Sequence, residues 1–417
     1  MRIRILDGRK KDRFVRDLEQ RGASDLAQVE PAVRQIVNDV RRNGDHALFR
    51  YAARWGDLDK SQAVCVTKAE LREAWKKASP QLRDAITQAA SNIRRYCVWQ
   101  KPREWRREIQ PGVCVGQLVR PLESVGCYVP GGRYPLPSTL LMTVIPAQVA
   151  GVGQIRVVSP HPVQATLAAA EFLGVREFYR VGGAQAIAAL AYGTESIPRV
   201  SKIVGPGNRY VTAAKKLVAF DCAIEFLAGP TEAVFISDKG DPVLIACDLV
   251  AQAEHDPDAL CILITSSREL AKAVQTEVQR RANTNPIAAE SLTHRGAILL
   301  VSSLGEAVKT ANRIAPEHLT LPAVLAPSVQ NAGSIFLNEF TPQSAGDYIS
   351  GPNHVLPTGA MARVRSGLSV LDYVRIISCQ EVSREGIHRI ALPAIALAEA
   401  EGLRGHAESL RARCSHA

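Results

Sequence analysis

The spacing of apolar residues in the first third of the chain predicts helices. Between residues 30 and 55 apolar side chains recur at intervals of three and four, as on the buried face of an amphipathic helix. The same spacing returns between residues 71 and 99, where Pro80 predicts a break. These two stretches are therefore expected to be helical.

A different pattern begins at residue 154, where short apolar runs alternate with segments of helical spacing. Such alternation is typical of parallel βαβ units. The predicted strands are 154–159, 177–181, 202–204, 223–227, 233–237, 260–265, 297–301 and 334–337. The predicted helices include 164–173, 185–192, 210–218, 242–255 and 305–314. The sequence thus predicts an α/β fold with two blocks of parallel sheet, followed by a helical segment after Ser369.

Composition places the chain among globular proteins of more than one domain. Its 417 residues exceed one ordinary domain, and 46% of them are hydrophobic and 22% charged. The nine cysteines are scattered and form no Cys-x-x-Cys motif, which is typical of reduced, cytoplasmic proteins. The longest apolar run, 390–398, is too short to cross a bilayer. We therefore expect a cytoplasmic protein with no membrane partner.

The formal net charge of +10 raises the question of an anionic partner. Basic residues are dense near the start of the chain and between residues 101 and 107. They would suit nucleic acid or a phosphate-bearing cofactor, or they belong to an ordinary solvated surface. Because no aromatic residues interleave with a basic stripe, we expect no nucleic-acid partner.

Three glycine-rich turns follow predicted strands. They lie at Gly131-Gly132, Gly182-Gly183 and 205–208. Glycine lets a backbone approach a phosphate closely, and helix N-termini favour anions. None of the turns matches the Gly-x-Gly-x-x-Gly fingerprint, so ordinary βα turns remain an alternative explanation.

Histidine and carboxylate residues recur together in the second half of the chain. Gln252 and His255 are three apart on a predicted helix, a spacing that projects both from one face. They could share a zinc ion with Asp347 and another histidine, although a histidine at a helix end explains the pattern equally. Glu317 and His318 are adjacent and would diverge on a helix, so they could act in different proton-transfer steps or simply lie in a polar loop.

Further polar residues follow towards the C-terminus. Asp347 and His354 lie in turn-rich sequence, where site residues are often held. Glu401 and His406 lie so far along the chain that they would reach the same site only from the arm of a second subunit. The alternative is that both lie at an exposed helix end.

Taken together, these motifs resemble the histidinol dehydrogenase family, in order and over nearly the whole chain. They are PLESVGCYVPGGR at 121–133, GPGNRYV at 205–211, AGPTE at 228–232, DLVAQAEHD at 248–256, NRIAPEHL at 312–319, GDYISGPNHVLPT at 346–358, SGLSV at 366–370, and the pair Glu401 and His406. The resemblance implies an NAD-dependent zinc enzyme that oxidises L-histidinol through L-histidinal to L-histidine.

The resemblance also implies roles for individual residues. The zinc ligands, for one ion per subunit, would be Gln252, His255, Asp347 and, from the other subunit of a homodimer, His406. The acid–base residues would be Glu317 and His318. Substrate would be contacted by Thr231, His354 and Glu401 together with His318 and the zinc ligands; position 231 is usually serine in the family. NAD would be contacted by Tyr128, Gln185 and Asn208.

The family fold implies two incomplete Rossmann-like domains with parallel sheets, plus small helical terminal segments, in an intertwined homodimer. The expected boundaries are an N-terminal segment at 1–25, a first domain at 26–127 and 233–368 with the catalytic and metal residues, a second domain at 128–232 on the NAD side, and a dimerisation arm at 369–417.

Two rival functions remain open from the sequence. One is a paralogous zinc and NAD dehydrogenase that acts on another small amino or hydroxy alcohol. The other is a non-enzymatic protein that binds nucleic acid on the same scaffold, for which the clustered polar residues would serve no purpose.

Overall fold

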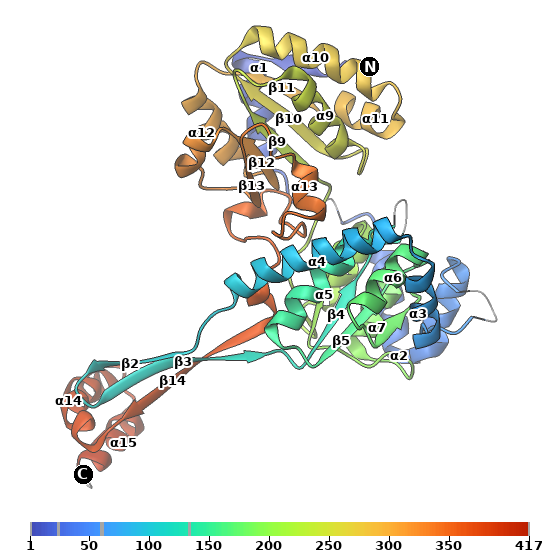
Figure 1. Ribbon diagram of the computed structural model, residues 1–417. Helices are drawn as coiled ribbons and strands as arrows, with labels where there is room; N and C mark the ends of the chain where they lie inside the picture. Colours follow the sequence, from blue (N-terminus) through green and yellow to red (C-terminus); the bar gives the residue numbers. More distant parts are fainter. Residues whose placement is uncertain (1, 23–25, 59–61, 132–134, 416–417) are drawn as a thin grey trace.

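The computed structural model describes residues 2–22, 26–58, 62–131 and 135–415. Two lobes, each built on a parallel sheet, lie next to each other, and a long arm leads away from the second lobe to the C-terminus (Figure 1). The predicted α/β class with two parallel sheets is confirmed, with a small antiparallel sheet in addition.

The first lobe contains a parallel sheet in the order β1-β11-β10-β9-β12-β13. Its strands are β1 (Arg4–Leu6), β9 (Glu232–Ile236), β10 (Leu260–Thr265), β11 (Ala297–Leu300), β12 (His318–Leu321) and β13 (Ser334–Leu337). Its helices are α1 (Gly8–Glu19), α9 (Pro242–Ala253), α10 (Arg268–Ala282), α11 (Pro286–His294), α12 (Leu304–Ile314) and α13 (Gln343–Tyr348), with 3-10 turns η1 (Ala323–Ser328) and η2 (Met361–Arg363).

Both faces of this sheet are buried. On β9, Ala233 and Phe235 pack into one core with α9, α10 and α11, whereas Val234 and Ile236 pack into another core with α1 and α12. Two buried faces explain why the strands read as continuous apolar runs rather than as alternating ones.

The second lobe contains a parallel sheet in the order β6-β5-β4-β7-β8. Its strands are β4 (Ser124–Tyr128), β5 (Gln154–Val158), β6 (Glu177–Tyr179), β7 (Lys202–Val204) and β8 (Ala223–Ile224). Its helices are α2 (Glu30–Arg54), α3 (Lys68–Lys77), α4 (Pro80–Gln100), α5 (Pro137–Ala150), α6 (Gln164–Phe172), α7 (Gly183–Tyr192) and α8 (Arg209–Val218). The five strands of the second sheet, and the strands β9 to β13 of the first, follow the 3-2-1-4-5 order that is typical of doubly wound folds.

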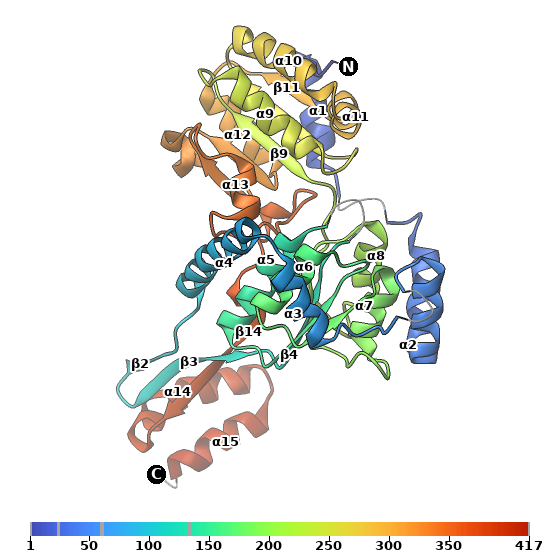
Figure 2. The ribbon, with the colours of Figure 1, turned by 45° about the vertical axis from the view of Figure 1, so that its right-hand side comes forward.

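The arm is an antiparallel sheet in the order β14-β3-β2, capped by two helices (Figure 2). Its elements are β2 (Trp105–Gln110), β3 (Val113–Pro121), η3 (Val370–Tyr373), β14 (Val374–Val382), α14 (Arg384–Ala400) and α15 (Arg404–Ser415). The prediction of a wholly helical segment after Ser369 is therefore wrong. The strand was missed because most of β14 is exposed and carries no clear alternation of apolar and polar residues.

The packing of the first 127 residues differs from the expected domain boundaries. The N-terminal residues form no separate segment, because β1 pairs with β11 and α1 packs on α12. Residues 26–127 do not join the first sheet. Helices α2, α3 and α4 pack on α7, α6 and α5 of the second lobe, and β4 is the central strand of its sheet. The reason is tertiary: an apolar helix face predicts burial but not the sheet that buries it.

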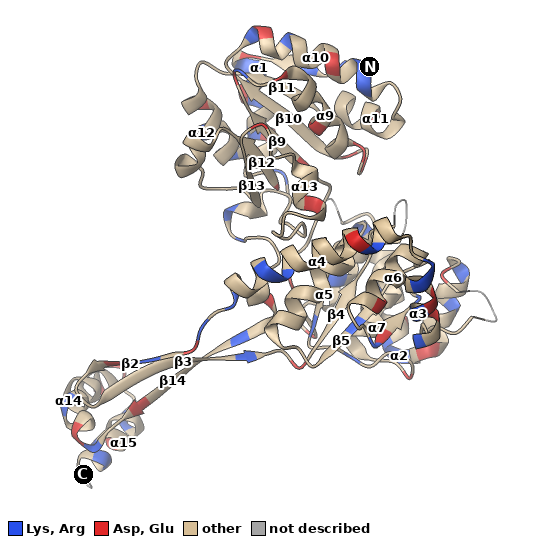
Figure 3. Ribbon diagram, viewed as in Figure 1, with Lys and Arg blue, Asp and Glu red and all other residues tan. Residues whose placement is uncertain are grey.

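The charged side chains and the cysteines are spread over the whole fold. Lys and Arg lie interspersed with Asp and Glu over both lobes and the arm (Figure 3). All nine cysteines lie within the described ranges and are free thiols. Every helix within the described ranges is too short or too polar to cross a membrane.

Candidate active site

The predicted site residues gather where the two lobes meet. Glu317, His318 and Thr231 lie at the amino ends of β12 and β9 in the first sheet. Tyr128 ends β4 in the second sheet, and Asn208 lies between β7 and α8. The first lobe thus presents the amino edge of its sheet, and the second lobe presents the carboxyl edge, where doubly wound folds usually bind nucleotides.

A sharp turn brings Glu317 and His318 to that edge. Helix α12 ends at Ile314, its C-cap residue Ala315 adopts a left-handed conformation with φ 51°, and Pro316 then prevents the helix from continuing. His318 starts β12 and lies opposite Ala233 and Ser334 in the sheet. Glu317 does lie in the turn after a helix, but both side chains are buried, with Glu317 7% exposed and His318 3% exposed.

The His318 ring lies between two carboxylates. Its Nδ1 is 3.6 Å from Glu317 Oε2, and its Nε2 is 3.5 Å from Asp347 Oδ1. Both distances are long for hydrogen bonds, and neither ring nitrogen has another partner. The ring also stacks on Phe336, with centroids 5.7 Å apart. A buried imidazole with two unsatisfied nitrogens is poised to exchange a proton with a bound molecule.

Burial and charge together set the protonation of this group. Burial opposes a charged imidazole, but the carboxylates of Glu317 and Asp347 outweigh it and raise the pKa of His318 to about 10. Burial raises the pKa of Glu317, although His318 acts in the opposite direction. His318 lowers the pKa of Asp347 despite the burial of that carboxylate. Perturbed acid and base groups of this kind cluster at functional sites.

Asp347, on α13, connects the other predicted residues. Its Oδ2 accepts a hydrogen bond of 3.2 Å from Nε2 of Gln252 in the last turn of α9. Its backbone carbonyl lies 2.7 Å from Nδ1 of His354, whose Nε2 is 3.1 Å from Thr139 Oγ1. Burial lowers the pKa of His354, so this ring is predominantly neutral. Residues from α9, β12, α13 and α5 therefore converge at one point.

His255 approaches the site differently from the prediction. Helix α9 ends at Ala253, so His255 does not share a helical face with Gln252 and the expected geometry is wrong. The chain turns after the helix because Pro257 and two nearby carboxylates, Asp256 and Asp258, favour a turn. His255 is exposed and lines a cavity between the lobes.

That cavity, of about 770 Å³, holds all three residues assigned to NAD. Tyr128, Gln185 and Asn208 line it, together with apolar side chains that include Ile36, Trp55 and Leu136. Gln185 is 1% exposed and its Oε1 has no hydrogen-bond partner, so this buried oxygen is available to a bound ligand. An apolar slot with a few polar atoms is typical of a cofactor site.

All three residues also have structural contacts, and part of the first motif lies outside the described residues. Gln185 Nε2 donates a 3.1 Å hydrogen bond to Asp57 Oδ2. The Tyr128 hydroxyl accepts a 3.1 Å hydrogen bond from the Gly183 amide. The Asn208 side chain accepts hydrogen bonds from Tyr210 and Val211 and thereby caps α8. Of the glycine-rich turn at 128–133, Gly132 and Arg133 are not among the described residues.

Gln252, His255 and Asp347 supply the oxygen and nitrogen donors that zinc accepts. Within the described ranges, however, no group of three or more His, Cys, Asp or Glu residues is placed to hold a metal ion. The residues present thus supply suitable donor atoms for zinc, but the described part of one chain does not by itself assemble a His, Cys, Asp or Glu cluster around them.

Glu401 and His406 are not brought to this site within one chain. Both lie exposed where α14 and α15 meet, and these two helices belong to the arm (Figures 1 and 2). Sequence reasoning also missed residues that hold the site together, above all Thr139, Phe336 and Glu232. Glu232 lies inside a quoted motif, but no local signal marks the other two.

The chain matches known proteins of one family over most of its length. The family model described as histidinol dehydrogenase matches residues 19–414. The histidinol dehydrogenase of Methanothermobacter thermautotrophicus is 46% identical, with 96% of this chain and 97% of the relative covered. That of Geobacter sulfurreducens is 44% identical, with 94% and 95% covered.

A solved structure agrees with the sequence comparisons. The crystal structure of histidinol dehydrogenase from Elizabethkingia anophelis superposes with a TM-score of 0.93 at 34% identity, and 99% of this chain and 98% of that chain are covered. The chain therefore belongs to the histidinol dehydrogenase family.

Proposed function

We propose that this oxidoreductase converts L-histidinol to L-histidine in two hydride transfers, with L-histidinal as the intermediate. The overall balance is one alcohol, one water and two NAD⁺ giving one carboxylate, two NADH and three protons. The observation that carries the proposal is the buried His318 between two carboxylates. A cavity between the lobes, lined by His255, Tyr128 and Gln185, supports it.

His318 is the proposed general base for the substrate hydroxyl in each hydride step. Its two unsatisfied ring nitrogens support this role. The pKa of about 10 reflects the full negative charges of Glu317 and Asp347 beside the ring. When Asp347 also binds a cation, its charge is partly neutralised, and the imidazole pKa moves towards the neutral range suited to a base.

Glu317 is the proposed base for the water that hydrates the aldehyde between the two oxidations. Its Oε2 lies beside His318 Nδ1, so both groups face one reacting centre. Burial of the pair excludes bulk water, which protects an aldehyde intermediate from loss.

A zinc ion held by Gln252, His255, Asp347 and the partner subunit's His406 would act as a Lewis acid and anchor the substrate nitrogen atoms. The chain's own residues then orient the carbinol carbon: His354 is fixed on Asp347 and Thr139, and Thr231 lies at the start of β9. Fixing the reacting atoms in this way lowers the entropic part of the barrier.

A homodimer would complete the site. The arm carries exposed apolar side chains, among them Leu392 at 76% and Leu397 at 68% exposed, which a monomer would leave in water. A second copy that covers this arm would also carry Glu401 and His406 to the other subunit's site.

The direct test measures NADH absorbance with purified protein, L-histidinol and NAD⁺. We expect two NADH per L-histidinol consumed and loss of activity after chelation, restored by Zn²⁺. A panel of other amino and hydroxy alcohols serves as the control for the paralogous alternative. Faster turnover of any of them than of L-histidinol, or full activity without a divalent ion, would contradict the proposal.

A further inference from the structure

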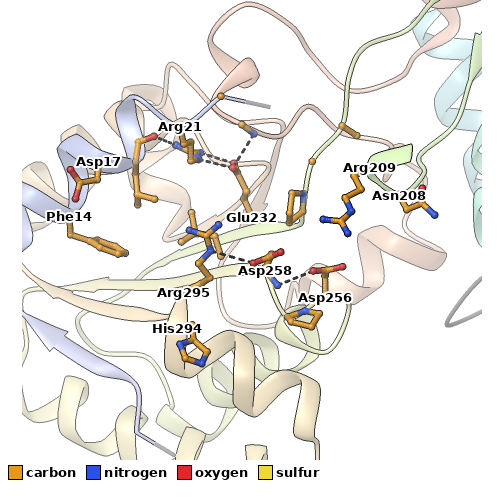
Figure 4. Close-up of a pocket in the computed structure, with 18 of the residues that line it drawn as sticks. Phe14, Asp17, Arg21, Asn208, Arg209, Glu232, Asp256, Asp258, His294 and Arg295 are labelled. Carbon is orange, nitrogen blue, oxygen red and sulfur yellow. Dashed lines mark hydrogen bonds and ion pairs between the residues drawn. The ribbon is translucent and has the colours of Figure 1, made fainter. Parts of the chain in front are cut away.

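Arg21 lies just beyond α1 and makes a fork of hydrogen bonds into the first lobe. Its Nε and Nη2 each donate to a different oxygen of Glu232, both at 2.7 Å (Figure 4). Its Nη1 donates to the carbonyl of Leu18 at 2.6 Å and to that of Ile314 at 2.8 Å. The pair is largely buried, with side chains 15% and 6% exposed. A bidentate pair of this kind fixes the geometry of both partners.

Both groups that Arg21 grips lead directly to Glu317. Ile314 is the last residue of α12, three positions before Glu317, so its carbonyl anchors the turn that delivers the catalytic pair. Glu232 starts β9, and its backbone amide donates a 3.0 Å hydrogen bond to Glu317 Oε2. This is the same oxygen that faces His318 Nδ1.

A further contact fixes the Glu232 carboxylate from the opposite side. Its Oε1 also accepts a 3.0 Å hydrogen bond from the Gly359 amide. Without the guanidinium, a buried carboxylate would remain uncompensated close to a second one, that of Glu317, and both would shift apart. The donor that orients Glu317 Oε2 would move with them.

We propose that Arg21 is a positioning residue for Glu317 that acts through Glu232 and through the Ile314 carbonyl. It touches neither substrate nor cofactor. The inference rests on the proposed function, in which Glu317 activates water for the aldehyde step. It predicts that replacing Arg21 selectively slows the oxidation of L-histidinal, as replacing Glu317 does, but to a smaller extent.

The experiment compares R21M with E317Q in two assays that separate the steps. One is oxidation of L-histidinal by NAD⁺, which needs the water step, and the other is reduction of L-histidinal by NADH, which does not. We expect R21M to lower kcat of the oxidation about 10- to 100-fold through misplacement of Glu317. The reduction, the KM for L-histidinol and the zinc content should change little.

R313M is the matched control. Arg313 also makes a bidentate pair between α12 and α1, with Nε and Nη2 at 2.7 and 2.9 Å from the oxygens of Glu19, but it has no contact with Glu232. R313M should leave the ratio of the two assays unchanged. If R21M behaves like R313M, or lowers both assays by one factor, the inference fails.

A double variant addresses the case in which R21M folds poorly. R21M/E232Q removes both charges and leaves a neutral pair, so its thermal midpoint should recover, while the selective loss of aldehyde oxidation persists. A normal ratio in a well-folded double variant would overturn the inference. E317Q tests the proposed function separately. Equal loss in both assays for E317Q would reject the water role, whereas a selective loss of aldehyde oxidation in E317Q that R21M does not share would reject only the role of Arg21.

Discussion

At the scale of single residues, the buried titratable groups of this protein differ in whether their nitrogen atoms have hydrogen-bond partners. Lys215 donates to Glu225 Oε1 at 2.6 Å and to the Gly205 carbonyl, which holds the glycine turn after β7 in place. His318 instead keeps both ring nitrogens without a partner at 3% exposure. The Lys215 ion pair serves the structure, although Glu225 Oε2 itself has no hydrogen-bond partner. A buried imidazole that leaves both nitrogens unpaired carries a free-energy cost, and such groups cluster at functional sites.

The first prediction concerns His318. Replacing it with asparagine (H318N) removes the base but keeps a polar side chain of similar position, so turnover should fall about 10²- to 10⁴-fold. Zinc content should stay at one ion per subunit, because His318 is not an assigned ligand. Steady-state NADH formation and elemental analysis of the same preparation measure both quantities, and near-normal turnover in this variant would refute the assignment.

At the scale of elements, α1 belongs to the first lobe although, apart from β1, the elements of that lobe begin more than 200 residues later. It packs on α12, where Lys11 pairs with Glu306 at the start of α12 and Glu19 pairs with Arg313 near its end. Docking at both ends fixes the position of Leu18 and Arg21, and therefore of the contacts that reach Glu317.

The pH dependence of stability tests this docking. The Lys11 ammonium, with the Ser302 backbone amide and hydroxyl, lowers the pKa of Glu306 to about 2. A carboxylate whose pKa is lowered on folding stabilises the native state above its ordinary pKa of 4.5, and this contribution is lost as the pH falls towards 2. E306Q should therefore be less stable than the wild type at pH 6, by at most about 1 kcal/mol because the side chain is partly exposed.

The difference between E306Q and the wild type should shrink steadily below pH 4.5. Urea unfolding at pH 6, 4 and 3 measures it. E290Q, on the exposed surface of α11, is the control and should show no such trend. A difference that stays constant from pH 6 to pH 3 would contradict the role given to the Lys11 pair.

At the scale of the whole molecule, the proposed dimer predicts that each site is shared between two chains. Glu401 and His406 belong to the helical part of the arm, α14 and α15, which lies away from the junction of the lobes (Figure 1), whereas Gln252 is hydrogen-bonded to Asp347 in the first lobe. In a dimer with twofold symmetry, each arm would complete the site of the other subunit.

Complementation between two inactive variants tests this arrangement. H406N should lack a zinc ligand that acts in the other subunit, and E317Q should lack the water base in its own subunit. Half of the dimers in an equal mixture are mixed and each contains one intact site, so about a quarter of wild-type activity should return. Each variant assayed alone is the control, and a mixture no more active than its components would show that His406 does not act across the dimer.

Much of the fold was predictable because its signals are local. Strands such as β7, β10 and β13 were predicted with their observed bounds, since short apolar runs between turn signals survive in any tertiary context. The chemical residues were also recognisable, because Glu317, His318 and Asp347 lie in long motifs that the family shares.

Other features depend on contacts between distant parts of the chain. Strand β14 pairs with β3 from more than 250 residues away, and no local pattern in either strand records that pairing. The link from Arg21 through Glu232 to Glu317 spans almost 300 positions, and Arg21 lies in an ordinary polar stretch.

Local periodicity along the sequence thus sufficed for the βα units and for their parallel character, while the resemblance to a family pointed to the candidate site residues. It did not indicate which sheet buries α2, α3 and α4, or that the amino edge of one sheet faces the carboxyl edge of the other. The physical reason is that periodicity reports which face of an element is buried, whereas the choice of partner comes from the summed packing of residues that are distant in sequence.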